Sequence, residues 1–94
     1  MEKIPVIKCK EFILYFEEVN KNIFLHCDVN VKWSKEVKTK LIEGLDILKK
    51  TFDMLVLLDL ENKKLGKFID LLGFEYLKSI IGNDNKDYDI YVWR

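Results

Sequence analysis

The character and spacing of the apolar residues change along this chain, and that change constrains the fold more than any other feature. Residues 11 to 31 are rich in aromatic and β-branched side chains, which favour β-strands. From Ser34 onward apolar residues recur at spacings of three and four, as they do along one face of a helix. A strand-like run, a second helical stripe and two more strand-like runs follow. The pattern predicts a sheet with helices packed on it.

The first strands are predicted to form a hairpin. The runs "EFILYFEEV" and "NIFLHCDVNV" meet at the turn residues Asn20, Lys21 and Asn22. Because successive side chains of a strand point to opposite faces, the second strand has one face made of Ile23, Leu25, Cys27, Val29 and Val31. Its other face is made of Phe24, His26, Asp28 and Asn30. The segment "IPVIKCK" is expected to add a strand before them, and Pro5 suits a strand start or an edge.

Two helices are predicted, with a strand between them. The first runs from about residue 35 to 51 after an N-cap at Ser34, and its apolar stripe is Val37, Leu41, Leu45, Leu48 and Phe52. The run "DMLVLLDL" is apolar without alternation, which is typical of a central strand covered on both faces. The second helix begins after Asn62 and ends at Gly73, where a left-handed residue is expected. Its apolar stripe is Leu65, Phe68, Ile69 and Leu72.

The predicted fold is α+β and forms a single domain over residues 1–94. The strands "YLKSII" and "YDIYVW", on either side of the loop "GNDNKD", complete the order β, β, β, α, β, α, β, β. This order predicts a mixed sheet of five or six strands with a central parallel pair, antiparallel hairpins on its flanks and two helices packed on it. A chain of 94 residues is long enough for one core and too short for two.

Composition excludes several classes of protein. The 16 Lys and Arg residues balance the 16 Asp and Glu residues, so no overall charge attracts nucleic acid or a membrane surface. No apolar run reaches the roughly 20 residues of a membrane span, and the first residues do not resemble a signal peptide, so a cytoplasmic location is expected. Cys9 and Cys27 are predicted to be reduced and half-buried. With His26 as the single histidine, no metal site is predicted.

One segment resembles a known family. Asn62, followed by Phe68, Leu72, Gly73 and Phe74, resembles the "N-x-x-A-x-x-[LF]-Y-x-x-x-G-F" segment of the GNAT superfamily of acyl-CoA N-acyltransferases. The order of elements from residue 11 to 94 is similar to the second half of that family's fold. The resemblance implies a GNAT-like domain that lacks the strand and two helices which members usually carry before the hairpin. In its compactness the chain is similar to GNAT-like proteins encoded by phages.

The resemblance also implies where a cofactor would bind. GNAT enzymes hold the pyrophosphate of acetyl-CoA in an "[RQ]-x-x-G-x-[GA]" loop at a helix N-terminus. Here that place reads "VKWSKEVKTKL" and contains no glycine. Val37 and Thr39 would bring β-branched side chains to the phosphate site, and Glu36 would repel the phosphates. If acetyl-CoA binds, the resemblance assigns its contacts to Val31, Trp33, Ser34, Lys35, Val37, Lys38 and Asn62.

Candidate catalytic residues are few. Many family members use a tyrosine in the Asn-to-Gly-Phe segment to protonate the leaving thiolate, but Ile69 stands at that position. A general base in the family often lies on the strand before the phosphate loop, where this chain has His26 and Asp28 on one face. We therefore consider His26 and Asp28 as a catalytic pair, with a solvated or hydrogen-bonded strand face as the alternative. Cys27 points the other way and is expected in the core rather than as a nucleophile.

Two functions remain open at this point. The first is a domain that has lost acetyl-CoA chemistry, binds no cofactor and acts as a protein-binding or assembly module. The alternative is a small N-acetyltransferase that uses acetyl-CoA in an atypical cradle. Nucleic-acid binding is disfavoured by the balanced charge, although Trp33 lies among lysines.

A homodimer is the expected working state. With the family's N-terminal elements missing, an open apolar surface is expected around Phe12, Leu14, Tyr15, Phe16 and Trp33. The strands "FILYF" and "YDIYVW" are the candidates for an exposed sheet edge.

Overall fold

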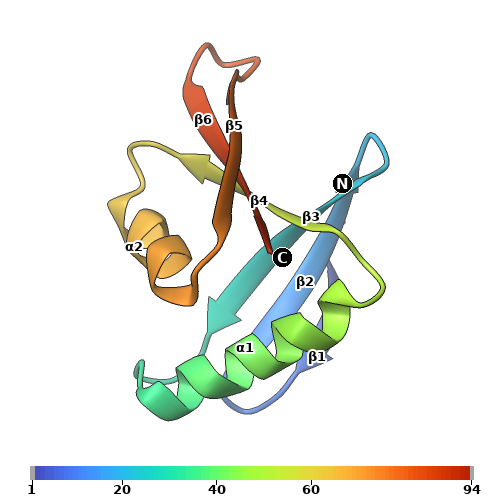
Figure 1. Cartoon of the computed structure of the whole chain (residues 1–94), viewed down its shortest axis with the longest axis vertical. Coiled ribbons are helices and arrows are strands. Elements are labelled where there is room, and N and C mark those ends of the chain that lie inside the picture. The colour runs from blue at the N-terminus through green and yellow to red at the C-terminus, as the bar shows by residue number, and fades with distance from the viewer. Residues whose placement is uncertain (1, 94) are drawn as a thin grey trace.

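A computed structural model describes residues 2–93 as one mixed sheet with two helices (Figure 1). The strands are β1 (Ile4–Lys8), β2 (Phe12–Val19), β3 (Asn22–Val29), β4 (Met54–Asp59), β5 (Glu75–Ile81) and β6 (Asp87–Trp93). The helices are α1 (Lys35–Lys49), between β3 and β4, and α2 (Lys63–Leu72), between β4 and β5. The order of elements is the one predicted from the sequence.

The six strands lie in the order β1-β2-β3-β4-β6-β5. The pair β3–β4 is parallel and the other neighbouring pairs are antiparallel. This confirms the predicted α+β class, the mixed sheet and its central parallel pair. Neither helix of the described residues combines the length and the apolar character that a bilayer crossing requires.

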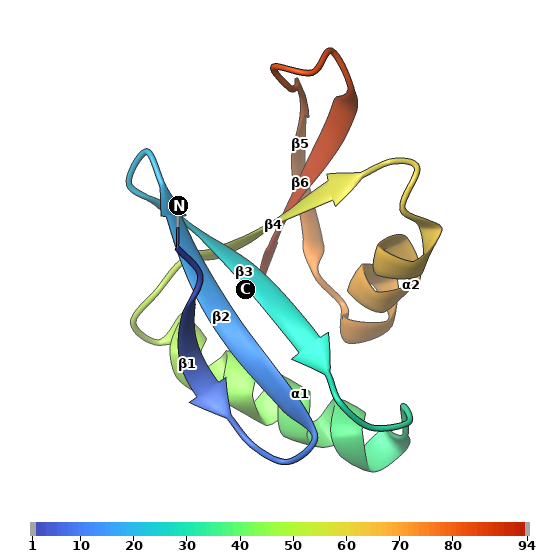
Figure 2. The same cartoon turned by 180° about the vertical axis from the view of Figure 1, so that it is seen from behind.

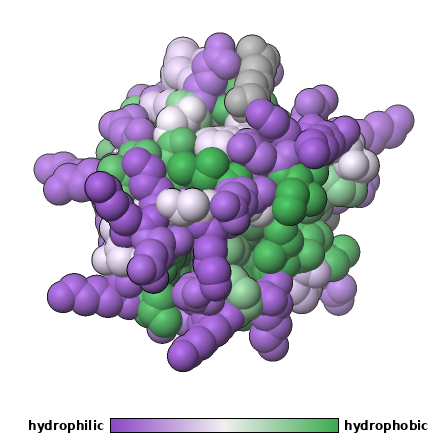
Figure 3. Space-filling model, turned by 60° about the horizontal axis from the view of Figure 1, so that its bottom comes forward, coloured by the Kyte–Doolittle hydropathy of each residue, from purple (hydrophilic) through white to green (hydrophobic). Residues whose placement is uncertain are grey.

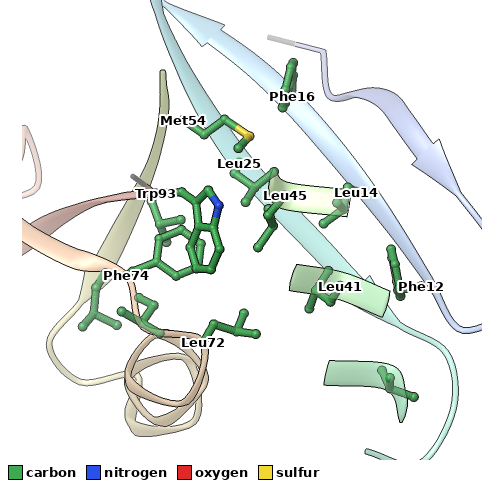
Figure 4. Close-up of a cluster of buried hydrophobic side chains, with 14 residues drawn as sticks. Phe12, Leu14, Phe16, Leu25, Leu41, Leu45, Met54, Leu72, Phe74 and Trp93 are labelled. Carbon is green, nitrogen blue, oxygen red and sulfur yellow. The ribbon is translucent and has the colours of Figure 1, made fainter. Parts of the chain in front are cut away.

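Side chains from both helices meet in one core on one face of the sheet. The register places Phe16 beside Leu25, Ile23 beside Met54 and Met54 beside Trp93, so these strand residues share a face. Figure 4 shows Leu41 and Leu45 from α1, together with Leu72 at the end of α2, against this face. Viewed from behind, β1, β2 and β3 lie in front of α1 (Figure 2). The sheet therefore has one face that carries helices and one that does not.

The prediction that "DMLVLLDL" is covered on both faces is wrong. Met54, Val56 and Leu58 are buried in the core, whereas Leu57, which points the other way, is 39% exposed. The reason is that both connections, through α1 and through α2, cross the same face. Periodicity alone did not reveal this, because β4 is apolar on its open side as well.

The predicted apolar opening around residues 12–16 is also wrong. Phe12, Leu14 and Phe16 are buried, because α1 covers them, and Tyr15 and Trp33 are half-buried. Exposed apolar side chains occur elsewhere, at Ile47 on α1 and Ile81 on β5 for example. Figure 3 shows apolar groups in green at the surface, between hydrophilic side chains in purple.

The two strands expected at a sheet edge lie inside the sheet. β2 is covered by β1, and β6 lies between β4 and β5. The edges are β1 and β5. The chain places β5 outside β6 because the connection through α2 skips one strand position, which the last strand then fills.

Local signals predicted the turns and helix ends well. Asn20 and Lys21 have φ of 52° and 68°, as the two central residues of a tight hairpin turn require. Ser34 caps α1 by accepting a hydrogen bond from the Val37 N–H, and Asn62 caps α2 by accepting from the Leu65 N–H. Gly73 ends α2 with φ of 88°, as predicted.

Gly73 provides a first test of this fold. Nothing lies within 4 Å of the position that a Cβ would occupy, so a substitution there changes only the backbone energy. We expect Gly73→Val to lower the free energy of unfolding by roughly 1–2 kcal/mol, because a β-branched residue resists the left-handed conformation. Gly73→Asn is the matched control, since asparagine tolerates this conformation and should cost less. Equal stability of all three proteins in urea unfolding would contradict this account of the helix end.

Candidate functional site

The parallel strands β3 and β4 form a fork. They pair only through Ile23 with Met54 and Phe24 with Leu55, and then diverge on either side of α2 (Figures 1 and 2). Beyond the fork, residues 25–29 of β3 and 56–59 of β4 have no partner from each other's strand. Their outer sides remain paired, to β2 and β6. The fork is thus an opening inside the sheet, not at its edge.

A cleft follows the fork and continues past it. Its inner hollow, about 770 Å³, lies between the diverging strands and α2, with Leu25, Val56 and Ile69 among its lining residues. Its outer hollow, about 780 Å³, lies between the segment after β3 and α2, with Trp33 and Leu71 in its lining. Both hollows contact Val29, Lys64 and Phe68. Because they share these residues, we treat them as one cleft.

The backbone of β3 directs hydrogen-bonding groups into this cleft. The Asn30 N–H donates to the Glu11 carbonyl at 2.8 Å, so the backbone N–H and C=O groups of Asn30 point toward β2. In an antiparallel pair the residues that bond to the partner alternate with residues whose groups point away. The backbone N–H and C=O groups of Asp28 and His26 therefore also point toward β2. Cys27 and Val29 direct their N–H and C=O groups toward the fork, as does the C=O of Leu25. The N–H of Leu25 is used in the last parallel pairing, with Leu55.

The histidine is held by a residue that the sequence reasoning missed. His26 Nε2 lies 2.8 Å from Glu17 Oε1, across the β2–β3 ladder. Asp28 shares a face with His26, as predicted, but lies near the Tyr15 hydroxyl. Burial raises the pKa of Tyr15, and a hydrogen bond to Asp28 adds to the effect. The hairpin register could have revealed Glu17, because Tyr15 stands opposite His26 and Glu17 is the next residue on that face. A catalytic role for His26 and Asp28 stays a prediction.

The start of α1 differs from the predicted cradle. The side chain of Val37 is buried in the core, so the expectation that it would fill a phosphate site is wrong. Its backbone N–H is bonded to Ser34 Oγ at 3.3 Å. The Thr39 hydroxyl donates to the Lys35 carbonyl at 3.0 Å and lies exposed on the helix. Lys35 is exposed and Lys38 is half-buried.

The remaining cofactor candidates lie on the cleft. Val31 and Trp33 line the outer hollow, and Asn62 lines the inner one. The Trp33 ring packs edge-on against the Phe68 ring at a centroid distance of 5.5 Å. This contact joins the segment before α1 to the face of α2. The structure thus brings Val31, Trp33 and Asn62 to one cleft, and leaves Val37 outside it.

The cysteine on the cleft is not a reactive thiol. Burial raises the pKa of Cys27 to about 12, and the nearby Asp28 carboxylate adds to the effect. The thiolate form that attacks an acyl group is therefore disfavoured. Within residues 2–93 no group of three or more His, Cys, Asp and Glu side chains is arranged to hold a metal ion.

Comparison with known proteins finds no matching family model, no similar curated protein and no similar solved structure.

Proposed function

We propose that the chain is a GNAT-like protein-binding module without acetyl-CoA chemistry, and that its cleft takes an extended peptide segment of a partner protein. One observation carries the proposal: a strand with free hydrogen-bonding groups runs along an apolar cleft. The order of elements and the caps of α2 at Asn62 and Gly73 support the GNAT-like arrangement.

The residues at the start of α1 do not fit the pyrophosphate of acetyl-CoA. One of the first-turn N–H groups is already bonded to Ser34, and Glu36 places a negative charge in the same turn. The segment before the helix has no glycine to let a phosphate approach the backbone. Ile69, at the position of the family's tyrosine, is 1% exposed and has no proton to donate.

An extended peptide fits the free side of β3. A strand that adds to a sheet gains main-chain hydrogen bonds, and its alternate side chains enter pockets. The C=O of Leu25 and both backbone groups of Cys27 and Val29 offer the hydrogen bonds. Residues 25–31 would span roughly 23 Å of such a strand. On the α2 side the peptide would meet the apolar surface of Phe68 and Leu71.

The cleft lining contains acidic residues as well as lysines, Asp70 and Glu17 among them, but the charge at the start of α2 is positive only. The first turn of α2 contains no acidic residue, while Lys63 and Lys64 lie there. The positive end of the helix dipole adds to their charge. We therefore propose a partner segment with apolar side chains at alternate positions and an acidic side chain close to Lys64.

Selection from a random peptide library on the purified protein tests this proposal. We expect enriched peptides with the apolar alternation and the acidic residue, and calorimetric binding by synthetic copies of them. If the selection yields no peptide that binds the folded protein, the proposed function is contradicted.

Acetyl-CoA provides the complementary test. We expect no rise in the melting temperature at millimolar acetyl-CoA, because a ligand that binds only the folded state must raise it by mass action. A saturable rise, with acetyl transfer to an amine, would favour the alternative of a small N-acetyltransferase.

A further inference from the structure

The sheet has two outer edge strands, β1 and β5, which lie at its opposite ends. The edge formed by β5 is the more exposed of the two, and its side chains distinguish it from β1. All seven residues of β5 are exposed. They include four large apolar side chains, Tyr76, Leu77, Ile80 and Ile81, and the last of these is 74% exposed. An exposed apolar edge strand is a template for pairing with another chain.

The other edge carries features that oppose such pairing. In β1, Pro5 lacks an N–H, and the ladder to β2 is irregular between Pro5 and Ile7. Lys3 and Lys8 add charge at the two ends of this strand. β5 also has an irregularity, between Tyr76 and Lys78, but its ladder from Lys78 to Ile81 is regular. Of the two edges, β5 is the one that is open to another strand.

The hydrogen bonds to β6 show which groups of β5 point outward. The Gly82 N–H donates to the Lys86 carbonyl at 2.9 Å, so Gly82 faces β6. By alternation along the regular ladder, Ile80 and Lys78 also face β6. Ser79 and Ile81 therefore direct their N–H and C=O groups away from the sheet.

We infer that β5 pairs with β5 of a second copy of this chain, antiparallel about a two-fold axis at Ser79. In this register Ser79 lies opposite Ser79, Lys78 opposite Ile80 and Leu77 opposite Ile81 of the second copy. The two outward-facing Ser79 residues then exchange both of their hydrogen bonds. The result is one continuous sheet of twelve strands, twice the six strands of each copy.

Neighbouring registers fit less well. Moving the axis to Lys78 would put the two Lys78 ammonium groups directly opposite each other, which is destabilising. Moving it to Ile80 would put Lys78 opposite Gly82, beyond the end of β5, and leave Leu77 with no opposite residue in the strand. Because the edge is complementary to itself about Ser79, a second copy suits it better than an unrelated strand. The chain's zero net charge also leaves no overall repulsion between copies.

This inference is independent of the peptide cleft, since β5 contributes no residue to the lining of either hollow. A pairing of two short strands is smaller than a standard interface, so we expect a dissociation constant on the order of 10 μM. Because β5 lies outside the cleft lining, a failed dimerisation test would leave the peptide-binding proposal standing, and a failed peptide test would leave the dimer standing.

Sedimentation velocity on the full chain, from micromolar to millimolar concentration, tests the inference. We expect the wild type to change from monomer to dimer, and Ser79→Pro to raise the dissociation constant at least about tenfold. The proline removes an N–H that faces outward, so the ladder to β6 keeps its hydrogen bonds. Ser79→Lys, which places two ammonium groups on the axis, should have the same effect if Ser79→Pro does not fold.

Ile47→Lys is the matched control, because Ile47 is exposed on α1 and lies outside this edge. It should dimerise as the wild type does. A wild type that stays monomeric at millimolar concentration would overturn the inference. So would dimerisation of the folded Ser79 variant with wild-type affinity.

Discussion

Trp93→Ala is expected to lower the free energy of unfolding by about 3–5 kcal/mol, as the loss of a large buried aromatic side chain does. Trp93 is 8% exposed, and its ring lies 5.0 Å from the Phe74 ring, centroid to centroid. Its Nε1 donates to Asp46 Oδ1 at 3.1 Å. One side chain thus joins the last strand to α1 and to the start of β5.

The loss is a large share of the 5–15 kcal/mol that stabilises a typical domain. The melting temperature should therefore fall by roughly 15 °C or more, measured by circular dichroism. Trp93→Phe is the control, since it keeps a ring against Phe74 and loses the hydrogen bond to Asp46, and it should cost roughly 1–2 kcal/mol. A melting temperature for Trp93→Ala within a few degrees of the wild type would show that the last strand is not part of the core.

Leu71→Asp is expected to weaken binding of a selected peptide at least about tenfold, without a matching loss of stability. Leu71 is 48% exposed in the last turn of α2 and lines the outer hollow. A carboxylate there would repel the acidic partner and replace an apolar contact, and a loss of about 1.4 kcal/mol corresponds to tenfold in affinity.

The control for this variant is Ile47→Asp. Ile47 is 65% exposed in the last turns of α1 and belongs to neither hollow. Both variants place a carboxylate near a helix C-terminus, so any general cost of that change is shared. We expect Ile47→Asp to bind the peptide as the wild type does, by calorimetry. Equal affinities of the two variants would exclude the outer hollow from the binding site.

Features that depend on neighbouring residues were predictable from the sequence. Ser34, Asn62 and Gly73 end their helices through short-range hydrogen bonds and backbone preference, and the Asn20-Lys21 turn fixes the hairpin in the same way. The order of elements, the α+β class and the parallel pair followed from these signals together with the apolar periodicity.

Features that depend on tertiary packing were not predictable from local patterns. The strands β3 and β4 stop pairing after Phe24 and Leu55, and no turn residue or proline in the sequence marks this point. Val37 was assigned to a phosphate loop by resemblance, and there the local pattern was the better guide, because periodicity placed Val37 in the apolar stripe of α1 and it is 4% exposed. The exposure of β5 also depends on strand order, which places β5 outside β6.

Amide hydrogen exchange measured with and without a selected peptide tests the central claim most directly. The N–H groups of Cys27 and Val29 point into the fork. Those of His26 and Asp28 face β2, and that of Leu25 is used in the pairing with Leu55, so these three serve as an internal reference. We predict that the peptide slows exchange at Cys27 and Val29 at least about tenfold and leaves Leu25, His26 and Asp28 nearly unchanged. Unchanged exchange at both Cys27 and Val29, in the presence of a saturating peptide, would contradict the claim that the cleft binds an added strand.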